Sequence, residues 1–406
     1  MRAAGPGRAG TGPAPGDGGR SAVLDPLLLD GLRTRLGAAA GTPDDAAVAD
    51  ALRASGRVLG SDALAELTRA ARAELSGAGP LQPLLEEPGV TDVLVNGPDE
   101  VWVDRGDGLR RSDVRLAGAA EVRALAVRMA AVAGARLDDA SPVVDARLPD
   151  GTRLHAAVEP IAPAGAVIAL RVLRQAVLDL PALTARGAVP AAWGPLLAGL
   201  VAGRANLLVT GGTGTGKTTL LAALLGLVPP GERLLTVEEA RELAPVHPHV
   251  VALAARRANV EGTGEVTLTD LVHGALRMRP DRIVLGECRG AEVRELLLAL
   301  NTGHDGGMAT VHANAAEHVP ARLEALAALA GMPRAAVAAQ AAAALDVVLH
   351  LRRRRGVRHL AQVAVVRLAA PGELEVRPVA TWDGPGTGDP APGPGWEDLL
   401  RRWGRC

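Results

Sequence analysis

The sequence predicts an α/β protein in which a smaller α+β domain precedes a larger carboxy-terminal domain. From Ala191 onward, short apolar segments alternate with helical patterns, as in a domain with a largely parallel sheet. Between Val90 and Glu159, two hairpin patterns each contain a turn-rich centre. A glycine-rich run from Gly211 to Gly216 separates an apolar strand from a helix in the later part. Together these three observations predict the fold class.

The composition is that of a globular protein with balanced charge. Hydrophobic residues make up 48% and charged residues 22% of the 406 residues, and the net charge is −1. No overall positive field therefore draws the chain to nucleic acid or anionic lipid. Two cysteines are too few for a disulfide framework or a four-cysteine zinc site. The amino terminus lacks the apolar core of a secretory signal, and no apolar run approaches the ~18 residues of a membrane span. We therefore expect a cytoplasmic protein.

Composition and periodicity divide the chain into five segments. Residues 1–61 mix low-complexity sequence with a weak helical pattern, and we expect them to form a mobile lead-in. The α+β domain is expected over 62–175, a Pro-containing linker over 176–190, and the α/β domain over 191–370. A Pro/Gly-rich tail is expected over 371–406. Strands of the α/β domain are expected at residues 206–210, 233–238, 282–286, 308–312 and 362–368.

The glycine-rich run is part of a complete phosphate-binding loop. Its glycines allow backbone N–H groups to converge on phosphate oxygens, and the positive end of the following helix adds to the attraction. Lys217 is expected to reach the β- and γ-phosphates of ATP, and the Thr218 hydroxyl is expected to coordinate Mg²⁺. A glycine-rich turn that fits by chance is the alternative, but the flanking strand and helix favour a nucleotide site. The residues of the loop are Gly211, Gly212, Thr213, Gly214, Thr215, Gly216, Lys217, Thr218 and Thr219.

Lys217 is the one lysine among 44 basic residues. Arginine and lysine share a charge but not a shape, because lysine is a compact point charge on a flexible stem. A chain that uses arginine at every other basic position keeps lysine where that geometry is needed. The solitary lysine thus supports the nucleotide-site interpretation.

Three carboxylates follow strands that are expected to be parallel. Glu287 ends an apolar strand, the place where P-loop enzymes carry the acid that holds Mg²⁺ or its water. Glu238 and Glu239 end the strand after the loop helix, and the carboxyl ends of parallel strands face the ligand crevice. For this pair, a solvated helix start is the alternative.

Other polar residues are less specific. His304 and His312 surround a glycine pair and a short strand, but a third ligand for a metal site is missing at suitable spacing. Arg147 and Arg171 lie on expected strands of the first domain, where most arginines are surface charges. The run Arg352–Arg355 has no aromatic neighbours on which bases could stack, so it indicates a solvated turn and no strong direct binding of nucleic acid.

From about Glu74 to His350 the chain resembles the secretion ATPase superfamily of type II secretion, type IV pilus assembly and type IV secretion. The resemblance is closest to its Tad/CpaF branch, which includes the Tad-family conjugal-transfer-associated ATPases of actinobacterial type. Several motifs occur in order along the chain. They include Val90-Thr-Asp-Val-Leu-Val-Asn-Gly-Pro, Ser141-Pro-Val-Val-Asp-Ala-Arg, the phosphate loop, Val237-Glu-Glu-Ala-Arg-Glu-Leu, Arg282-Ile-Val-Leu-Gly-Glu and Asn301-Thr-Gly-His-Asp-Gly.

This resemblance implies a homohexameric motor that hydrolyses ATP with Mg²⁺ and has a RecA-like P-loop NTPase domain at the carboxy-terminal end. It implies work on inner-membrane platform proteins of a pilus or secretion machine, at the cytoplasmic face of the membrane. Glu238 and Glu239 fall in the family's acidic box, which orients the attacking water, and Glu287 is the second-motif carboxylate. His312 falls in the box that senses the γ-phosphate. Arg147 and Arg171 match arginines that reach toward the nucleotide.

Departures from the pattern leave alternatives open. The chain lacks the four-cysteine zinc module of pilus-extension and type II relatives, which excludes those branches. Glu239 stands where Asp is expected, so either acid of the pair could be the working one. A conjugation-type motor that assists DNA transfer and a non-hydrolysing nucleotide switch are the alternative functions.

Overall fold

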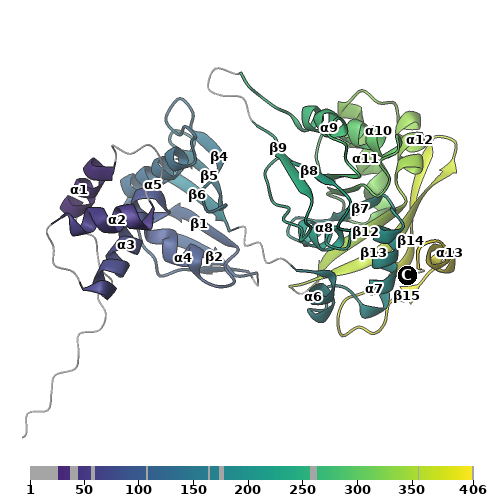
Figure 1. Cartoon of the computed structure of the whole chain (residues 1–406), viewed down its shortest axis with the longest axis horizontal. Coiled ribbons are helices and arrows are strands. Elements are labelled where there is room, and N and C mark those ends of the chain that lie inside the picture. The colour runs from purple at the N-terminus through teal and green to yellow at the C-terminus, as the bar shows by residue number, and fades with distance from the viewer. Residues whose placement is uncertain are drawn as a thin grey trace, which may run out of the picture. The chain divides into compact units, whose positions relative to one another are not determined.

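The computed structural model describes residues 26–36, 44–55, 60–106, 108–162, 165–172, 178–256, 263–354 and 356–404. The chain splits into two compact units, which meet in sequence at residues 174 and 175 (Figure 1). The sequence-based expectation for the α+β domain is residues 62–175, whereas the first unit also includes the residues before it. Both units combine helices and sheet, so the predicted α/β class is confirmed.

The first unit is built on a six-stranded antiparallel sheet with the order β3-β2-β1-β6-β5-β4. Apolar side chains alternate along its strands, and their buried face packs against α5 (Ala119–Val132). Both predicted hairpins occur, the second turning at Gly151, whose φ of +90° suits glycine. The strands are β1 (Asp92–Gly97), β2 (Glu100–Asp104), β3 (Leu109–Arg111), β4 (Val143–Arg147), β5 (Arg153–Val158) and β6 (Ala166–Arg171).

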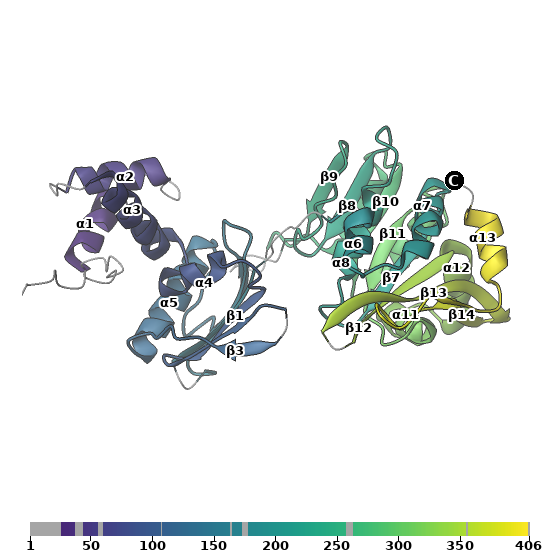
Figure 2. The ribbon, with the colours of Figure 1, turned by 90° about the horizontal axis from the view of Figure 1, so that it is seen from below.

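The described residues before this sheet form three α-helices and a short fourth one (Figure 2). They are α1 (Pro26–Leu36), α2 (Asp45–Arg53), α3 (Ser61–Ser76) and α4 (Gln82–Glu86). The first three share a small core, which contains Leu32, Val48 and Leu52. The Asp44 side chain caps α2 by accepting a hydrogen bond from the Ala47 N–H at 2.8 Å. The described part of the expected lead-in is therefore packed helix, because short helices with weak individual patterns bury their apolar residues against one another.

The second unit contains a nine-stranded sheet with the order β15-β14-β13-β12-β7-β11-β10-β8-β9. The strands from β12 to β9 run parallel, and β12 to β15 pair antiparallel. Both faces of the central strands are covered, so β7 and β8 are buried at every residue. The strands are β7 (Leu207–Gly211), β8 (Leu234–Glu238), β9 (Val250–Ala254), β10 (Arg282–Cys288), β11 (Met308–Val311), β12 (Val347–Arg354), β13 (Val357–Ala370), β14 (Glu373–Thr381) and β15 (Ala391–Pro392).

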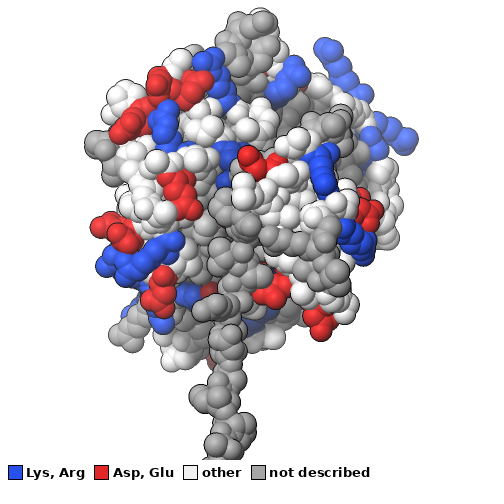
Figure 3. All heavy atoms as spheres, turned by 90° about the vertical axis from the view of Figure 1, so that its left-hand side faces the viewer, with Lys and Arg blue, Asp and Glu red and all other residues white. Residues whose placement is uncertain are grey.

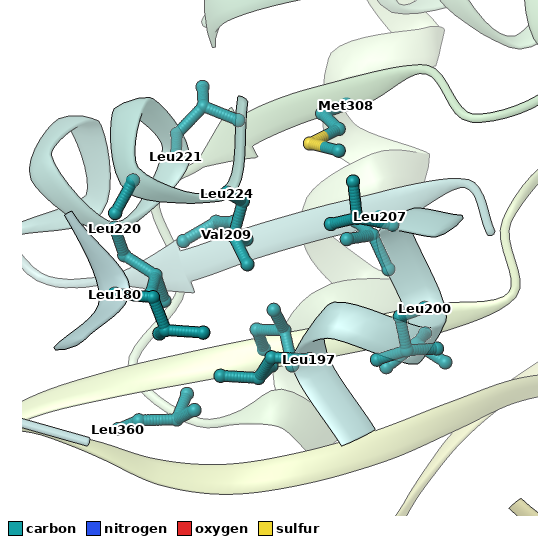
Figure 4. Packing of buried hydrophobic residues seen from close by; sticks show 14 of the residues in the cluster. Leu180, Leu197, Leu200, Leu207, Val209, Leu220, Leu221, Leu224, Met308 and Leu360 are labelled. Carbon is teal, nitrogen blue, oxygen red and sulfur yellow. The ribbon is translucent and has the colours of Figure 1, made fainter. Parts of the chain in front are cut away.

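Helices cover this sheet on both faces. One core contains residues of α6 (Leu180–Ala185), α7 (Gly194–Ala202) and α8 (Lys217–Leu225). The other core contains residues of α9 (Leu268–Leu276), α10 (Val293–Leu300), α11 (Val319–Leu329) and α12 (Arg334–Ala344). Figure 4 shows Leu220, Leu221 and Leu224 of α8 near Val209 of β7. This packing holds α8, and with it the loop between β7 and α8, in one place on the sheet.

Two segments differ from the sequence-based expectation. Within the expected linker 176–190, Leu180, Leu183 and Val189 are buried in the core of the second unit. Within the expected tail 371–406, β14 and β15 extend the sheet, and α13 (Trp396–Trp403) packs against α7 (Figure 2). The rings of Trp193 and Trp396 lie 6.3 Å apart there. Tertiary packing overrides the Pro- and Gly-rich composition of both segments.

Among the described residues, no single helix has the length and apolar composition needed to cross a membrane. Within the same described residues, one bent pair, Ala316–Leu329 and Arg334–Ala344, meets these criteria jointly, with an angle of 119° between its helices.

Candidate nucleotide-binding site

The loop between β7 and α8 forms an anion cradle. Gly214 and Gly216 have φ angles of +70° and +96°, which glycine adopts without steric cost. The loop also packs tightly on its neighbour, because a Cβ on Gly211 would lie 2.6 Å from the Leu351 carbonyl oxygen on β12. No described residue accepts a hydrogen bond from the backbone N–H groups of residues 213–216. These donors, at the start of a helix, fit the phosphate oxygens of a nucleotide.

Lys217 begins α8, and its ammonium reaches back across the loop. Its Nζ donates to the carbonyl oxygens of Gly211 at 3.2 Å and Gly212 at 3.1 Å. It also lies 3.4 Å from His312 Nε2. Burial lowers the pKa of Lys217, with Glu287 acting against this shift. The predicted phosphate-binding lysine is thus a confined charge whose tip faces the end of β11.

Glu287 and His312 lie together beside this lysine. Glu287 ends the apolar run of β10, His312 follows β11, and these two strands are parallel neighbours. His312 Nε2 lies 2.5 Å from Glu287 Oε1. Burial, followed by the charge of Lys217, lowers the pKa of His312, which favours the neutral ring. The sequence placed these residues in separate motifs, and the fold brings them into one group of contacts.

Arg289 was not singled out by sequence reasoning, yet it joins two of the predicted acids. Its guanidinium lies 3.1 Å from Glu239 Oε2 and forms an ion pair with Glu287. In the sequence, only its position two residues after Glu287 could have indicated a role at the site. That indication is weak because the chain contains many arginines. Arg289 therefore extends the group to Glu239 at the end of β8.

Glu238 has different surroundings from Glu239. It is 3% exposed, and its Oε1 accepts hydrogen bonds from the backbone N–H groups of Glu242 at 3.0 Å and Leu243 at 2.9 Å. Gly286 makes room for it, since a Cβ at that position would lie 2.6 Å from Glu238 Cγ. Glu238 thus anchors the loop after β8, while the half-exposed Glu239 faces Arg289.

The remaining predicted residues take simpler positions. Thr218 and Thr219 lie in the first turn of α8, and Thr215 bonds back to the Gly212 carbonyl at 2.9 Å. His304 Nδ1 contacts the Ala299 carbonyl oxygen at 3.2 Å, a structural role. No group of three or more His, Cys, Asp or Glu side chains among the described residues is placed to hold a metal ion without a nucleotide. Thr218 and Glu287 suit Mg²⁺ chemically, because hydroxyl and carboxylate oxygens are its preferred protein ligands.

Arg147 and Arg171 belong to the first unit. The register aligns Arg147 with Arg153 and Arg153 with Arg171, so all three lie on the same face of the sheet, opposite its core. Arg171 Nε donates to Asp92 Oδ1 at 3.0 Å, and Arg153 pairs with Asp145. A role of Arg147 and Arg171 at the nucleotide stays a prediction.

Basic and acidic side chains are interspersed on the face shown in Figure 3. Among the described residues of that face, positive charge does not gather into one continuous field. Such a mixed surface does not favour tight contact with a phosphate backbone.

Comparisons with known proteins identify the family of the chain. Residues 74–371 match the model of the family described as type II/IV secretion system protein. The chain is 57% identical over 329 residues to a putative conjugal transfer protein of Mycobacterium tuberculosis, covering 79% of this chain and 92% of the relative. It is 33% identical over 304 residues to the type IV secretion system protein PtlH of Bordetella pertussis, covering 68% and 89% of the two chains.

Among solved structures, the chain is similar to the VirB11 ATPase of the Brucella suis type IV secretion system, crystallised with sulphate. The identity is 26%, the match covers 74% of this chain and 96% of that one, and the TM-score is 0.36. The family model covers most of the chain, including the phosphate loop, Glu238, Glu287 and His312. This protein therefore belongs to the type II/IV secretion system protein family.

Proposed function

We propose that the chain hydrolyses ATP as a homohexameric motor of a secretion or pilus-assembly machine. The observation that carries this proposal is that His312 contacts both Lys217 and Glu287. These three residues lie beside a loop whose backbone N–H groups can donate to an anion. Nucleotide binding and hydrolysis are thus both placed at the carboxyl ends of neighbouring strands of the second unit's sheet.

Binding is the task of the phosphate loop and Lys217. The N–H groups of residues 213–216 hold phosphate oxygens, and the Lys217 ammonium shifts from its loop carbonyls toward the β- and γ-phosphates. Thr218 and Glu287 are the residues that would hold Mg²⁺, which supplies charge neutralisation between the terminal phosphates. A compact ammonium suits this position, whereas a planar guanidinium does not.

Hydrolysis needs a carboxylate that orients a water molecule at the γ-phosphate. Glu287, Glu239 and Glu238 all lie at the carboxyl ends of β10 and β8. The His312 ring contacts both Lys217 and Glu287, so it can transmit the state of the γ-phosphate to the acid. A switch that only binds nucleotide has no need for this set of acids, and we therefore favour hydrolysis.

The motor role draws on the family. The relatives named above are described as a conjugal transfer protein and type IV secretion proteins. We propose a comparable place for this chain, with a Tad/Flp-type pilus or a type IV secretion system as the machine. Inner-membrane platform proteins would be its partners at the cytoplasmic face. Arg147 and Arg171 are proposed to contribute to the nucleotide site.

The test is the set Glu287→Gln, Glu239→Gln and Glu238→Gln. Glu287→Gln should bind ATP normally and lose most hydrolysis, because the loop and Lys217 are intact while water and Mg²⁺ lose their acid. Glutamine keeps the Oε1 acceptor, so Glu238→Gln preserves both loop hydrogen bonds. A loss of hydrolysis in this variant would therefore indicate a catalytic role of the Glu238 carboxylate. The control is Glu375→Gln, since Glu375 also pairs with an arginine, Arg367, but lies on β14.

The measurements are steady-state ATPase rate and ATP affinity for each variant. Normal rates in all three site variants would contradict the proposed assignment.

A conjugation motor that assists DNA transfer is a second candidate, favoured by the printed description of the Mycobacterium tuberculosis relative. It predicts that single-stranded DNA binds the protein and raises its ATPase rate in low salt. The mixed charge on the face in Figure 3 speaks against this outcome.

A further inference from the structure

The hairpin of β12 and β13 places an arginine beside the phosphate loop that no motif assigns. β12 pairs with β7 up to Leu351 and Gly211, and the hairpin continues past this point. The Cδ atom of Arg358, on β13, lies 3.9 Å from the position that a Cβ on Gly216 would occupy. Gly216 is the residue directly before α8. Arg358 therefore flanks the start of the phosphate-binding helix.

The face of the strand on which Arg358 lies follows from its neighbours. Leu360 is two residues further along β13 and is buried in the core shared by α6, α7 and α8. Figure 4 shows Leu360 directed toward Leu180 and Leu197 of that layer. Residues two apart in a strand share a face, so Arg358 lies on the α8 side. The intervening residue, His359, therefore points to the opposite side of the strand. Its ring lies edge-on to the ring of Trp382, with the centroids 5.7 Å apart.

Arg358 is available for a ligand. It is exposed, and no described residue forms a hydrogen bond or an ion pair with its guanidinium. Other arginines at the site are engaged, as Arg289 is with Glu239 and Glu287. An arginine without a protein partner beside a nucleotide loop is a candidate for contact with the nucleotide itself.

The sheet order indicates which end of the nucleotide this is. Lys217, His312 and Glu287 mark the γ-phosphate end, on the side of β7 where β11 and β10 lie. The nucleoside end of an extended nucleotide would then lie on the other side of β7. β12 and β13 flank β7 on that side.

The second unit offers little else on which a base could stack. The chain has no Phe or Tyr. Of its tryptophans in the described part of this unit, Trp193 and Trp396 pack on each other, Trp382 packs on His359, and Trp403 packs beside Gly203. The planar guanidinium of arginine stacks on aromatic rings, whereas a lysine ammonium has no plane with which to stack.

We propose that Arg358 binds the nucleoside end of the nucleotide by stacking its guanidinium on the purine base. This inference rests on the proposed nucleotide site and adds to it a residue for base binding. Stacking of a base contributes about 1–2 kcal/mol, which corresponds to a change in dissociation constant of about 5- to 30-fold.

The experiment compares the binding of ADP with that of inorganic tripolyphosphate, which has phosphates but no nucleoside. Arg358→Ala should weaken ADP binding by about 5- to 30-fold and change tripolyphosphate binding by less than about twofold. Arg358→Lys should behave like Arg358→Ala, because it keeps the charge and loses the plane. The matched control is Arg352→Ala, an exposed arginine of the same hairpin whose partner in register is His359, on the other face.

Unchanged ADP affinity in Arg358→Ala would overturn the inference. A parallel loss of tripolyphosphate affinity, or recovery in Arg358→Lys, would show a charge contact with phosphate and would also overturn it. Failure of the wild-type protein to bind either ligand would instead overturn the proposed nucleotide site.

Discussion

Replacement of Lys217 separates a binding role from a structural one. The side chain is 8% exposed, and its ammonium donates to two loop carbonyls. Burial lowers the pKa of Lys217, which means that the folded protein disfavours this charge relative to water. Lys217→Ala removes the buried charge together with its hydrogen bonds, so the two effects on stability oppose each other. We expect the free energy of unfolding to change by less than about 1 kcal/mol.

Nucleotide affinity should respond far more strongly. A hydrogen bond to a charged group contributes about 1.5–3 kcal/mol, so loss of the ammonium should raise the dissociation constant for ATP and ADP by about 10- to 150-fold. Hydrolysis should be abolished. Lys217→Arg should also fail to turn over, because Nζ lies 3.1–3.2 Å from two loop carbonyls and leaves no room for a planar fork.

The assay pairs calorimetric titration of ADP and ATP with urea unfolding of the same variants. Wild-type affinity should also fall as pH rises toward the lowered pKa of Lys217, below its ordinary value of 10.5, and Lys217→Ala should not show this loss. Arg367→Ala, an exposed arginine on β13, serves as control. Near-normal turnover by Lys217→Arg, or destabilisation of Lys217→Ala by more than about 2 kcal/mol, would refute the reasoning.

Two further predictions concern other parts of the chain. Arg147→Ala and Arg171→Ala should fold normally, retain ADP binding and lose about 10³-fold in hydrolysis rate, whereas the exposed Arg115→Ala should change the rate little; equal rates for the three variants would remove the first unit from the mechanism. Burial lowers the pKa of His350 to about 4 while its Nδ1 contacts the Thr210 hydroxyl, so its contribution to stability is present above pH 6.5 and is lost as pH falls toward 4. That loss is up to about 3 kcal/mol, and urea unfolding at several pH values should show a shallower dependence in His350→Gln; an unchanged dependence would contradict it.

The conformation of the loop between β7 and α8 could be predicted from the sequence because it depends on contiguous residues. The glycine positions, the lysine and the flanking strand and helix are local features, and the structure places all of them as the motif requires. The hairpins of the first unit were equally accessible, since alternation and turn residues are also local. The described part of the lead-in, the linker and the tail was not, because its helices and strands are stable only against partners distant in sequence.

Within the site, the sequence by itself determined which residue types are present, and the tertiary structure decided which of them meet. Glu238 and Glu239 are adjacent in sequence and equivalent as carboxylates, yet one is buried on backbone N–H groups and the other faces Arg289. Successive residues at the end of a strand point to opposite sides, so their neighbours depend on what the fold brings to each side. The parallel register of β8, β10 and β11 likewise positions Arg289. The hairpin beside β7 positions Arg358. Such contacts arise between segments far apart in the chain, and no local pattern encodes them.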